Sequence, residues 1–143
     1  MGLQAIAGGL RDALGAVEGL ERVYVWRPDN VAPPCAVIET PETWDYDQTM
    51  GVGALVRWGM LITVVVARTD AVGGGEQLAA FIEEDGGTSV RRALEADPTL
   101  GGACDTLVMN PEGRVSNQSG VANIANIDYL VVRLRFDVYA RAG

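Results

Sequence analysis

The stretch IDYLVVRLRFDVYA, at residues 127–140, has the most regular pattern in the chain and decides its fold class. Every second side chain is apolar, in the series Leu130, Val132, Leu134, Phe136, Val138 and Ala140. The intervening positions hold Tyr129, Val131, Arg133, Arg135, Asp137 and Tyr139. Strict alternation over this length predicts a β-strand with one buried face and one polar, mainly charged face.

A second long segment, GALVRWGMLITVVVAR at residues 53–68, is apolar on one alternating face and mostly apolar on the other. A strand of that kind lies in the centre of a sheet or is covered on both sides. Gly59 is a position at which the strand could bend or form a bulge. The segment therefore predicts a central strand.

Three helices are predicted outside these strands. Residues 3–17, 75–84 and 89–96 carry apolar side chains at helical spacing, and Thr88 or Ser89 is suited to cap the last helix. We expect the helices to cover the apolar face of the 127–140 strand through residues such as Leu10, Leu14, Leu78 and Phe81.

Shorter segments rich in β-forming residues predict further strands. Residues 22–27 and 35–40 are expected to form an antiparallel pair joined by a short loop, and residues 103–109 form another strand. Residues 41–52 are predicted as a loop or a protruding hairpin tip, and residues 114–126 as a polar, partly extended excursion.

These segments together predict an α+β fold. An antiparallel or mixed β-sheet is covered on one face by an N-terminal helix and a two-helix insert. The length of 143 residues is typical of one domain, and no repeat or linker divides the chain. We therefore expect residues 1–143 to form a single domain.

The charge composition excludes several function classes. The chain has a net charge of -8 at pH 7, and all 11 of its basic residues are arginine, with no histidine. Net acidity argues against binding driven by nucleic-acid phosphates. Without histidine and lysine, the chain lacks the residues for a Ser-His-Asp system, an HExxH zinc site, a Schiff base or a P-loop. We expect no enzyme activity, no metal site and no cofactor.

Hydropathy and cysteine content point to a protein made in a cytoplasm. The longest apolar run, Met60–Ala67, is too short to span a bilayer, and the N-terminus lacks the basic region of a signal peptide. We therefore expect no membrane partner. The two cysteines, Cys35 and Cys104, are expected to be buried free thiols.

Two clusters could bind an ion, although a structural interpretation is favoured for each. Gly73–Gly75 could offer backbone amides to an anion, but no GxGxxG or GKS pattern accompanies them, which favours a flexible connection before a helix. Glu83–Asp85 could bind a divalent cation, but a solvated helix end is favoured.

A third cluster lies in the 41–52 segment. Glu42, Asp45 and Asp47 are interleaved with Trp44 and Tyr46, so two carboxylates could pair over an aromatic platform. A protein interface is the favoured interpretation, because tryptophan and tyrosine are enriched at protein contacts. Over the whole chain, the residues expected at an interface are Trp44, Tyr46, Asp47, Met50, Arg114, Val121, Ile124, Arg133 and Arg135.

Several segments, taken in order, resemble the tail terminator proteins of siphophages. They are the helix Leu3–Val17, the strand Pro33–Ile38, the aromatic-acidic loop, the strand Arg57–Arg68, the two-helix insert Glu76–Leu94, and the closing strands that end Tyr129–Val138. The string Asp97-Pro98-Thr99-Leu100-Gly101-Gly102, which precedes a strand, contributes most to this resemblance.

The resemblance implies a virion structural protein without catalytic residues. Such proteins form a hexameric ring on the last ring of the tail tube, end tube polymerisation and join the tail to the neck. The implied partners are other copies of the chain, the major tail tube protein and a neck or head-completion protein. DNA would pass through the lumen without specific binding, and a ring of six would carry roughly -48 charges. The implied location is the head-proximal end of the virion tail, after assembly in the host cytoplasm.

Two other interpretations stay open. One is a different protein of the same virion, such as a head-completion protein, a neck protein or a tail tube subunit. The other is a small-ligand binding α+β domain or enzyme, with a pocket near Trp26 and Trp58.

Overall fold

A computed structural model describes residues 3–26, 28–41, 43–45, 55–67, 71–82, 86–109, 118–124 and 127–141. Within these ranges, strands from both halves of the chain form one sheet, and the α+β prediction is confirmed. The elements follow in the order α1 (Leu3–Leu14), β1 (Arg22–Val25), β2 (Cys35–Ile38), β3 (Thr43–Asp45), β4 (Leu55–Ala67), α2 (Ala71–Ile82), α3 (Val90–Glu95), the 3-10 helix η1 (Leu100–Gly102), β5 (Thr106–Met109), β6 (Gln118–Ile124) and β7 (Ile127–Arg141).

The sheet is built around β4 and β7, the two strands predicted from the longest apolar patterns. They pair antiparallel along the whole of β4, from Leu55 opposite Arg141 to Ala67 opposite Tyr129. The pairing is continuous at Gly59, which lies opposite Asp137, so β4 forms no bulge against β7 there. β4 lies between β2 and β7, and its prediction as a central strand is confirmed.

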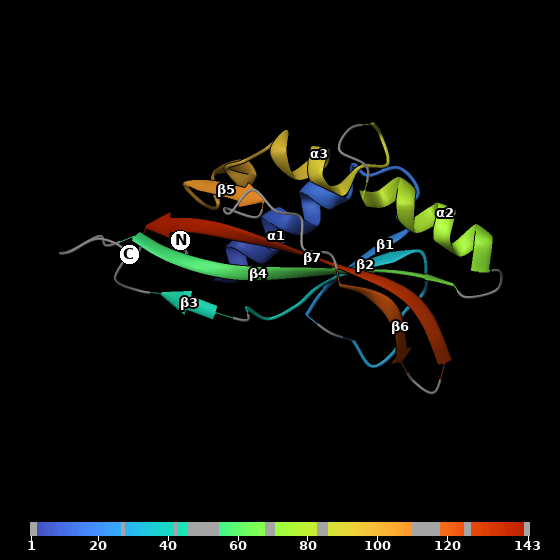
Figure 1. Cartoon of the computed structure of the whole chain (residues 1–143). Helices are drawn as coiled ribbons and strands as arrows, with labels where there is room; N and C mark the ends of the chain where they lie inside the picture. The colour runs from blue at the N-terminus through green and yellow to red at the C-terminus, as the bar shows by residue number, and fades with distance from the viewer. Residues whose placement is uncertain are drawn as a thin grey trace.

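The remaining strands extend the sheet on either side of this pair. The strand order is β1-β2-β4-β7-β5, with β3 paired to β4 and β6 paired to β7. β6 and the beginning of β7 form a hairpin that extends away from the helices (Figure 1).

The helices α1, α2 and α3, together called the helix layer, lie on one side of the long β4–β7 pair (Figure 1). Between the helix layer and the sheet lies the main core, which includes Ile6, Leu10, Leu14, Met60, Ile62, Val64, Phe81, Leu94, Val132, Leu134, Phe136 and Val138. The even-numbered side chains of β7 therefore face α1 and α2, as the alternation predicts.

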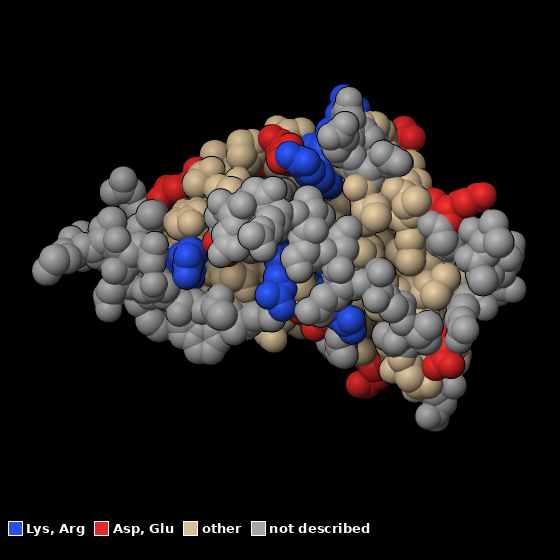
Figure 2. Space-filling model, in the orientation of Figure 1, with Lys and Arg blue, Asp and Glu red and all other residues tan. Residues whose placement is uncertain are grey.

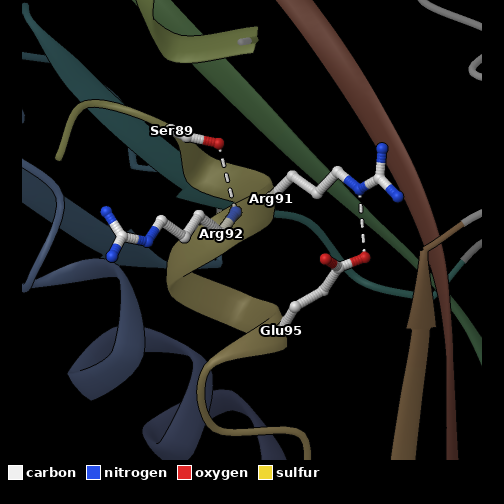
Figure 3. Close-up of polar contacts among 4 residues, drawn as sticks. All are labelled: Ser89, Arg91, Arg92 and Glu95. Atoms are coloured by element: carbon white, nitrogen blue, oxygen red, sulfur yellow. Dashed lines mark hydrogen bonds and ion pairs between the residues drawn. The ribbon is translucent and has the colours of Figure 1, made fainter. Parts of the chain in front are cut away.

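The polar contacts of α3 explain where this short helix begins. The Ser89 hydroxyl accepts a hydrogen bond of 3.1 Å from the backbone N–H of Arg92, which makes Ser89 the N-cap (Figure 3). The exposed side chains of Arg91 and Glu95 form an ion pair one turn apart, at 3.0 Å (Figure 3).

The expected antiparallel pairing of residues 22–27 with 35–40 is wrong, because β1 and β2 are parallel. The connecting residues do not make a hairpin turn. The backbone N–H of Ala32 donates to the Tyr24 hydroxyl (3.1 Å), and Val31 packs on the face of the sheet opposite the helices. The chain thus returns across that face before β2 begins, and β2 runs in the same direction as β1.

Other boundaries also differ from the prediction. Gly73–Gly75 lie inside α2, which begins at Ala71, so they are not a connection before the helix. Tertiary packing of α2 against β4 and β7 outweighs the low helix propensity of glycine. Part of the predicted 41–52 loop is β3, and part of the predicted 114–126 excursion is β6.

The predicted strand 103–109 is shortened at its beginning. The buried side chain of Leu100 and the left-handed backbone of Gly101 and Gly102 form η1, and β5 starts only at Thr106. Cys104 accordingly lies before the strand.

Candidate functional site

The face of the sheet opposite the helix layer, called the outer face below, is covered unequally. At one end it holds a second apolar cluster made of Cys35, Val37, Val65, Tyr129 and Val131, with Tyr24, Val31 and Ile124 packed against it. The strand β1, its connection to β2 and the β6–β7 hairpin supply these covering residues. This end of the outer face is therefore part of the folded interior.

The other end of the outer face carries arginines. Strand alternation places Arg57 on the same face of β4 as Val65, and Arg133 and Arg135 on the same face of β7 as Val131. Arg135 is exposed, and Arg57 and Arg133 are half-buried. We call these three residues the arginine row.

Further side chains surround the arginine row. Leu61 lies opposite Arg135 and Tyr139 opposite Arg57, and both are half-buried. Val108 lies opposite Asp137 and is 37% exposed. Seen from the side drawn in Figure 2, blue arginine atoms run along the region of β4 and β7, whereas red acidic atoms lie mostly toward the periphery.

The side chains of Asp137 and Glu39 share the outer face with the arginine row. Burial raises the pKa of Asp137, and the Arg57 guanidinium opposes this effect. Glu39 follows β2 and accepts a hydrogen bond of 3.3 Å from the hydroxyl of Thr63, a side chain only 3% exposed. Strand pairing also places Asp45 of β3 opposite Arg57, so the arginine row shares this part of the outer face with three acids.

Both cysteines are buried free thiols, as predicted. Burial raises the pKa of Cys35 to about 11, and burial together with the nearby Asp105 and Asp97 carboxylates raises that of Cys104 to about 11. Because the thiolate is the reactive form, neither thiol is activated as a nucleophile.

The clusters proposed from sequence for ion binding are only partly within the described residues. Gly73–Gly75 lie near the beginning of α2 and do not precede it. Glu83–Asp85, Glu42 and Asp47 lie outside the described residues, as does Tyr46. In the parts of the chain that the structure describes, no three His, Cys, Asp or Glu side chains are grouped to hold a metal ion. None of the helices within these parts has the length and hydropathy of a membrane span.

The structure locates five of the nine predicted interface residues. Trp44 lies on β3, paired with Trp58, and Val121 lies on β6, paired with Leu130. β3 pairs with β4 and β6 pairs with β7, so the backbones of Trp44 and Val121 lie on opposite edges of the sheet.

The other three located residues are on the outer face. Ile124 is half-buried against the second apolar cluster. Only Arg133 and Arg135 come together as a charged surface. Tyr46, Asp47, Met50 and Arg114 lie outside the described residues.

Strand pairing separates Trp26 from Trp58 and brings Arg57 to the outer face. Trp26 follows β1 and Trp58 lies on β4, with β2 between these strands, so the two tryptophans do not form a common wall. The sequence pattern alone does not indicate Arg57 as an interface residue. Arg57 alternates with the core-facing residues of β4. This places it beside Arg133 and Arg135 only when the register between β4 and β7 is known.

Comparison of the chain with protein-family models gives no match, and comparison with curated proteins gives no match either.

Proposed function

We propose that the chain is a virion structural protein of the siphophage tail terminator type. It forms a ring on the tail tube, ends tube polymerisation and joins the tail to the neck. The observation that carries this proposal is the agreement between the architecture implied by the sequence resemblance and the α+β fold. A helix layer covers one face of the sheet, and the α2–α3 pair follows the central strand β4.

Composition and surface chemistry support the same function. The chain has neither histidine nor lysine, so the common nucleophilic and Schiff-base systems are excluded by sequence. The outer face instead presents arginine and tyrosine side chains, which are typical of protein contacts. A ring subunit needs such contacts, because a closed ring joins two different surfaces of neighbouring copies.

The experiment compares the purified chain alone with the chain added to a polymerising tail tube protein from the same genome. Alone, the protein is expected to form discrete rings, and a hexamer of the 15.1 kDa chain would have a mass of about 91 kDa. When added to tube protein, it is expected to shorten the tubes and to lie at one end of each in electron micrographs.

Two of the virion alternatives, a tube subunit and a head-completion protein, have distinct outcomes in this experiment. Growth of the pure protein into long tubes would indicate a tube subunit. Rings that bind a neck protein but leave tube length unchanged would indicate a head-completion protein. A protein that stays monomeric and has no effect on tubes would contradict the proposal.

A further inference from the structure

The sheet ends in two short edge strands. β1 and β5 occupy the two ends of the strand order, and each has four residues. Within the described residues, no strand pairs with the other side of either one, which we call its free edge. An edge strand presents a row of backbone N–H and C=O groups that can pair with a strand of another chain.

The side chains near both free edges are incompletely covered. All four residues of β2 are buried, whereas Val23, Tyr24 and Val25 of the neighbouring β1 are half-buried. Val23 and Val25 lie on the side of the main core and Tyr24 lies on the outer face, so both faces of β1 lose cover at the same edge. On β5, Val108 is 37% exposed. A further strand at either edge would cover this apolar surface.

The two edge strands lack residues that commonly prevent pairing between sheets. Natural proteins often place lysine, proline or a central charge on an edge strand. The sequences of β1 and β5 are RVYV and TLVM, so the single charge of the two strands is Arg22, at the beginning of β1. Their composition therefore permits pairing with another chain.

The directions of β1 and β5 suit them to pair with each other in separate copies. β1 is parallel to β2, and the three pairings that lead from β2 through β4 and β7 to β5 are antiparallel. β1 and β5 therefore run in opposite directions. Copies related by rotation about an axis along the strands would bring β5 of one copy beside β1 of the next as an antiparallel pair, which is the more stable arrangement.

Backbone hydrogen bonds of β2 show which groups face each neighbouring strand. The Trp26 N–H donates to the Ile38 carbonyl (2.9 Å), and the Glu39 N–H donates to the Leu61 carbonyl (3.0 Å). Even-numbered groups of β2 thus face β1, and the odd-numbered Glu39 at its end faces β4. Because backbone groups alternate sides along a strand, the registers extend this assignment to the other strands.

The groups that result on the two free edges are compatible. On β1 they belong to Val23 and Val25, and on β5 to Leu107. All three side chains pack on the main core. An antiparallel pair with Val23 beside Leu107 therefore keeps the core side chains of both copies on one face, and it places Arg22 opposite Val108 on the outer face.

We propose that β1 of one copy pairs antiparallel with β5 of a second copy, so that the sheet continues from subunit to subunit. The contact joins two different edges, so repetition gives a closed ring in which both edges are covered, or an open helix. The inference rests on the proposed function, because it supplies the subunit interface of the ring. A strand of a different protein is less favoured, because the chain itself carries both matching edges.

The first test is cross-linking between two variants of the full chain, Arg22→Cys and Val108→Cys, which carry different mass tags. Both positions are exposed. The native thiols are buried with a pKa of about 11, so they are expected not to react. In the mixture, a short bis-maleimide is expected to join R22C to V108C, as measured by intact-mass spectrometry. R22C–R22C or V108C–V108C as the main product would overturn the inference, because like edges would then be paired.

The second test blocks the free edge of β1. Val23→Pro removes the N–H that faces this edge, and proline is tolerated on an edge strand where the N–H faces solvent. Self-association is expected to weaken by about tenfold or more, because a hydrogen bond between copies is lost. The matched control Val23→Ala loses the same side-chain packing but keeps the N–H. Equal association constants for the two variants in sedimentation or mass photometry would overturn the inference.

Hydrogen exchange gives a third measurement, on the unmodified chain, which decides the matter if V23P fails to fold. Exchange of the Val23 and Leu107 amides is expected to slow when the protein assembles. The Tyr24 amide faces β2 and is expected to be protected before and after assembly, which makes it the internal control. Equal exchange of Val23 and Leu107 in dilute and assembled protein contradicts the pairing.

The outcomes distinguish this inference from the proposed function. Rings in which R22C and V108C do not cross-link overturn the inference and leave the ring proposal standing. Filaments or small oligomers in which R22C is joined to V108C support the inference and contradict the terminator ring.

Discussion

Cys35 and Cys104 illustrate how burial lowers the reactivity of a side chain. Both thiols have a pKa of about 11, and their exposed fractions are 0% and 3%. We expect iodoacetamide near pH 8 to label neither residue in the native protein and both in denaturant, because the reactive thiolate is scarce and inaccessible. Intact-mass spectrometry counts the labels. Rapid native labelling of Cys35 would contradict its place in the second apolar cluster.

Asp137 provides a pH-dependent test at the residue scale. Its pKa is raised from 3.8 in the folded chain, so the ionised carboxylate lowers stability at pH values above the folded pKa. This destabilisation disappears as the pH falls through the pKa of Asp137 in the folded chain toward its pKa in the unfolded chain. Asp137→Asn is therefore expected to unfold at higher denaturant concentration than wild type near pH 7. Its advantage should shrink near pH 4, and an advantage that grows in acid would contradict the assignment.

Only part of the candidate site could be predicted from the sequence. Arg133 and Arg135 could be assigned to one face from sequence, because both belong to one alternating strand. Arg57 could not be added to them, because its position depends on the pairing of two strands that lie far apart in the chain. The edge residues Trp44 and Val121 could not be separated for the same reason.

At the scale of elements, two adjacent glycines of α1 provide a matched pair. A Cβ at Gly8 would have no neighbour within 4 Å, whereas a Cβ at Gly9 would lie 2.8 Å from the Cβ and carbonyl oxygen of Leu100. Gly8→Ala is expected to stabilise the protein by about 0.5–1 kcal/mol through helix propensity. Gly9→Ala is expected to destabilise it by about 1–3 kcal/mol through overpacking.

Urea denaturation of the two variants measures this difference. Equal effects would mean that α1 does not pack closely on η1 at Gly9. Opposite signs are expected even though the two substitutions are chemically identical.

The core side of β7 is tested by Phe136, which is 1% exposed. Phe136→Ala is expected to lower the free energy of unfolding by about 3–5 kcal/mol, because it removes a buried ring and leaves a cavity. Arg135→Ala, one position along on the exposed face, is the control and should change stability by about 0.5 kcal/mol or less. A loss below about 1 kcal/mol for Phe136→Ala would mean that the faces of β7 are reversed.

Elements with a strong internal period were predictable, and elements that depend on distant contacts were not. The faces of β7 and the buried side of α1 follow from spacing alone. The parallel direction of β1 and β2 depends on the course of the intervening chain across the outer face. There the Tyr24 hydroxyl accepts a hydrogen bond from the backbone N–H of Ala32. The early start of α2 likewise depends on packing, since its glycines favour no helix by themselves.

At the scale of the whole molecule, one sheet joins segments from both halves of the sequence. β4 and β7 contribute to the main core and to the second apolar cluster, so neither cluster can be lost separately. We expect unfolding in urea to be a single transition, with tryptophan fluorescence and far-ultraviolet circular dichroism giving coincident curves. Two separated transitions would show that the chain contains independently folding parts.

The long pairing of β4 with β7 also determines the order of events in time. Ala67 and Tyr129 are its closest partners along the chain, so roughly sixty residues must be synthesised after β4 before the ladder can begin. Until then the segment LITVVVA at residues 61–67 can pair with β2 along one edge, but its other edge has no partner strand. It is uncharged and rich in β-branched residues, which is the composition of segments that aggregate. The nascent chain therefore passes through a vulnerable interval, and the yield of folded protein should depend on temperature and chaperone supply during synthesis more than on the stability of the finished fold.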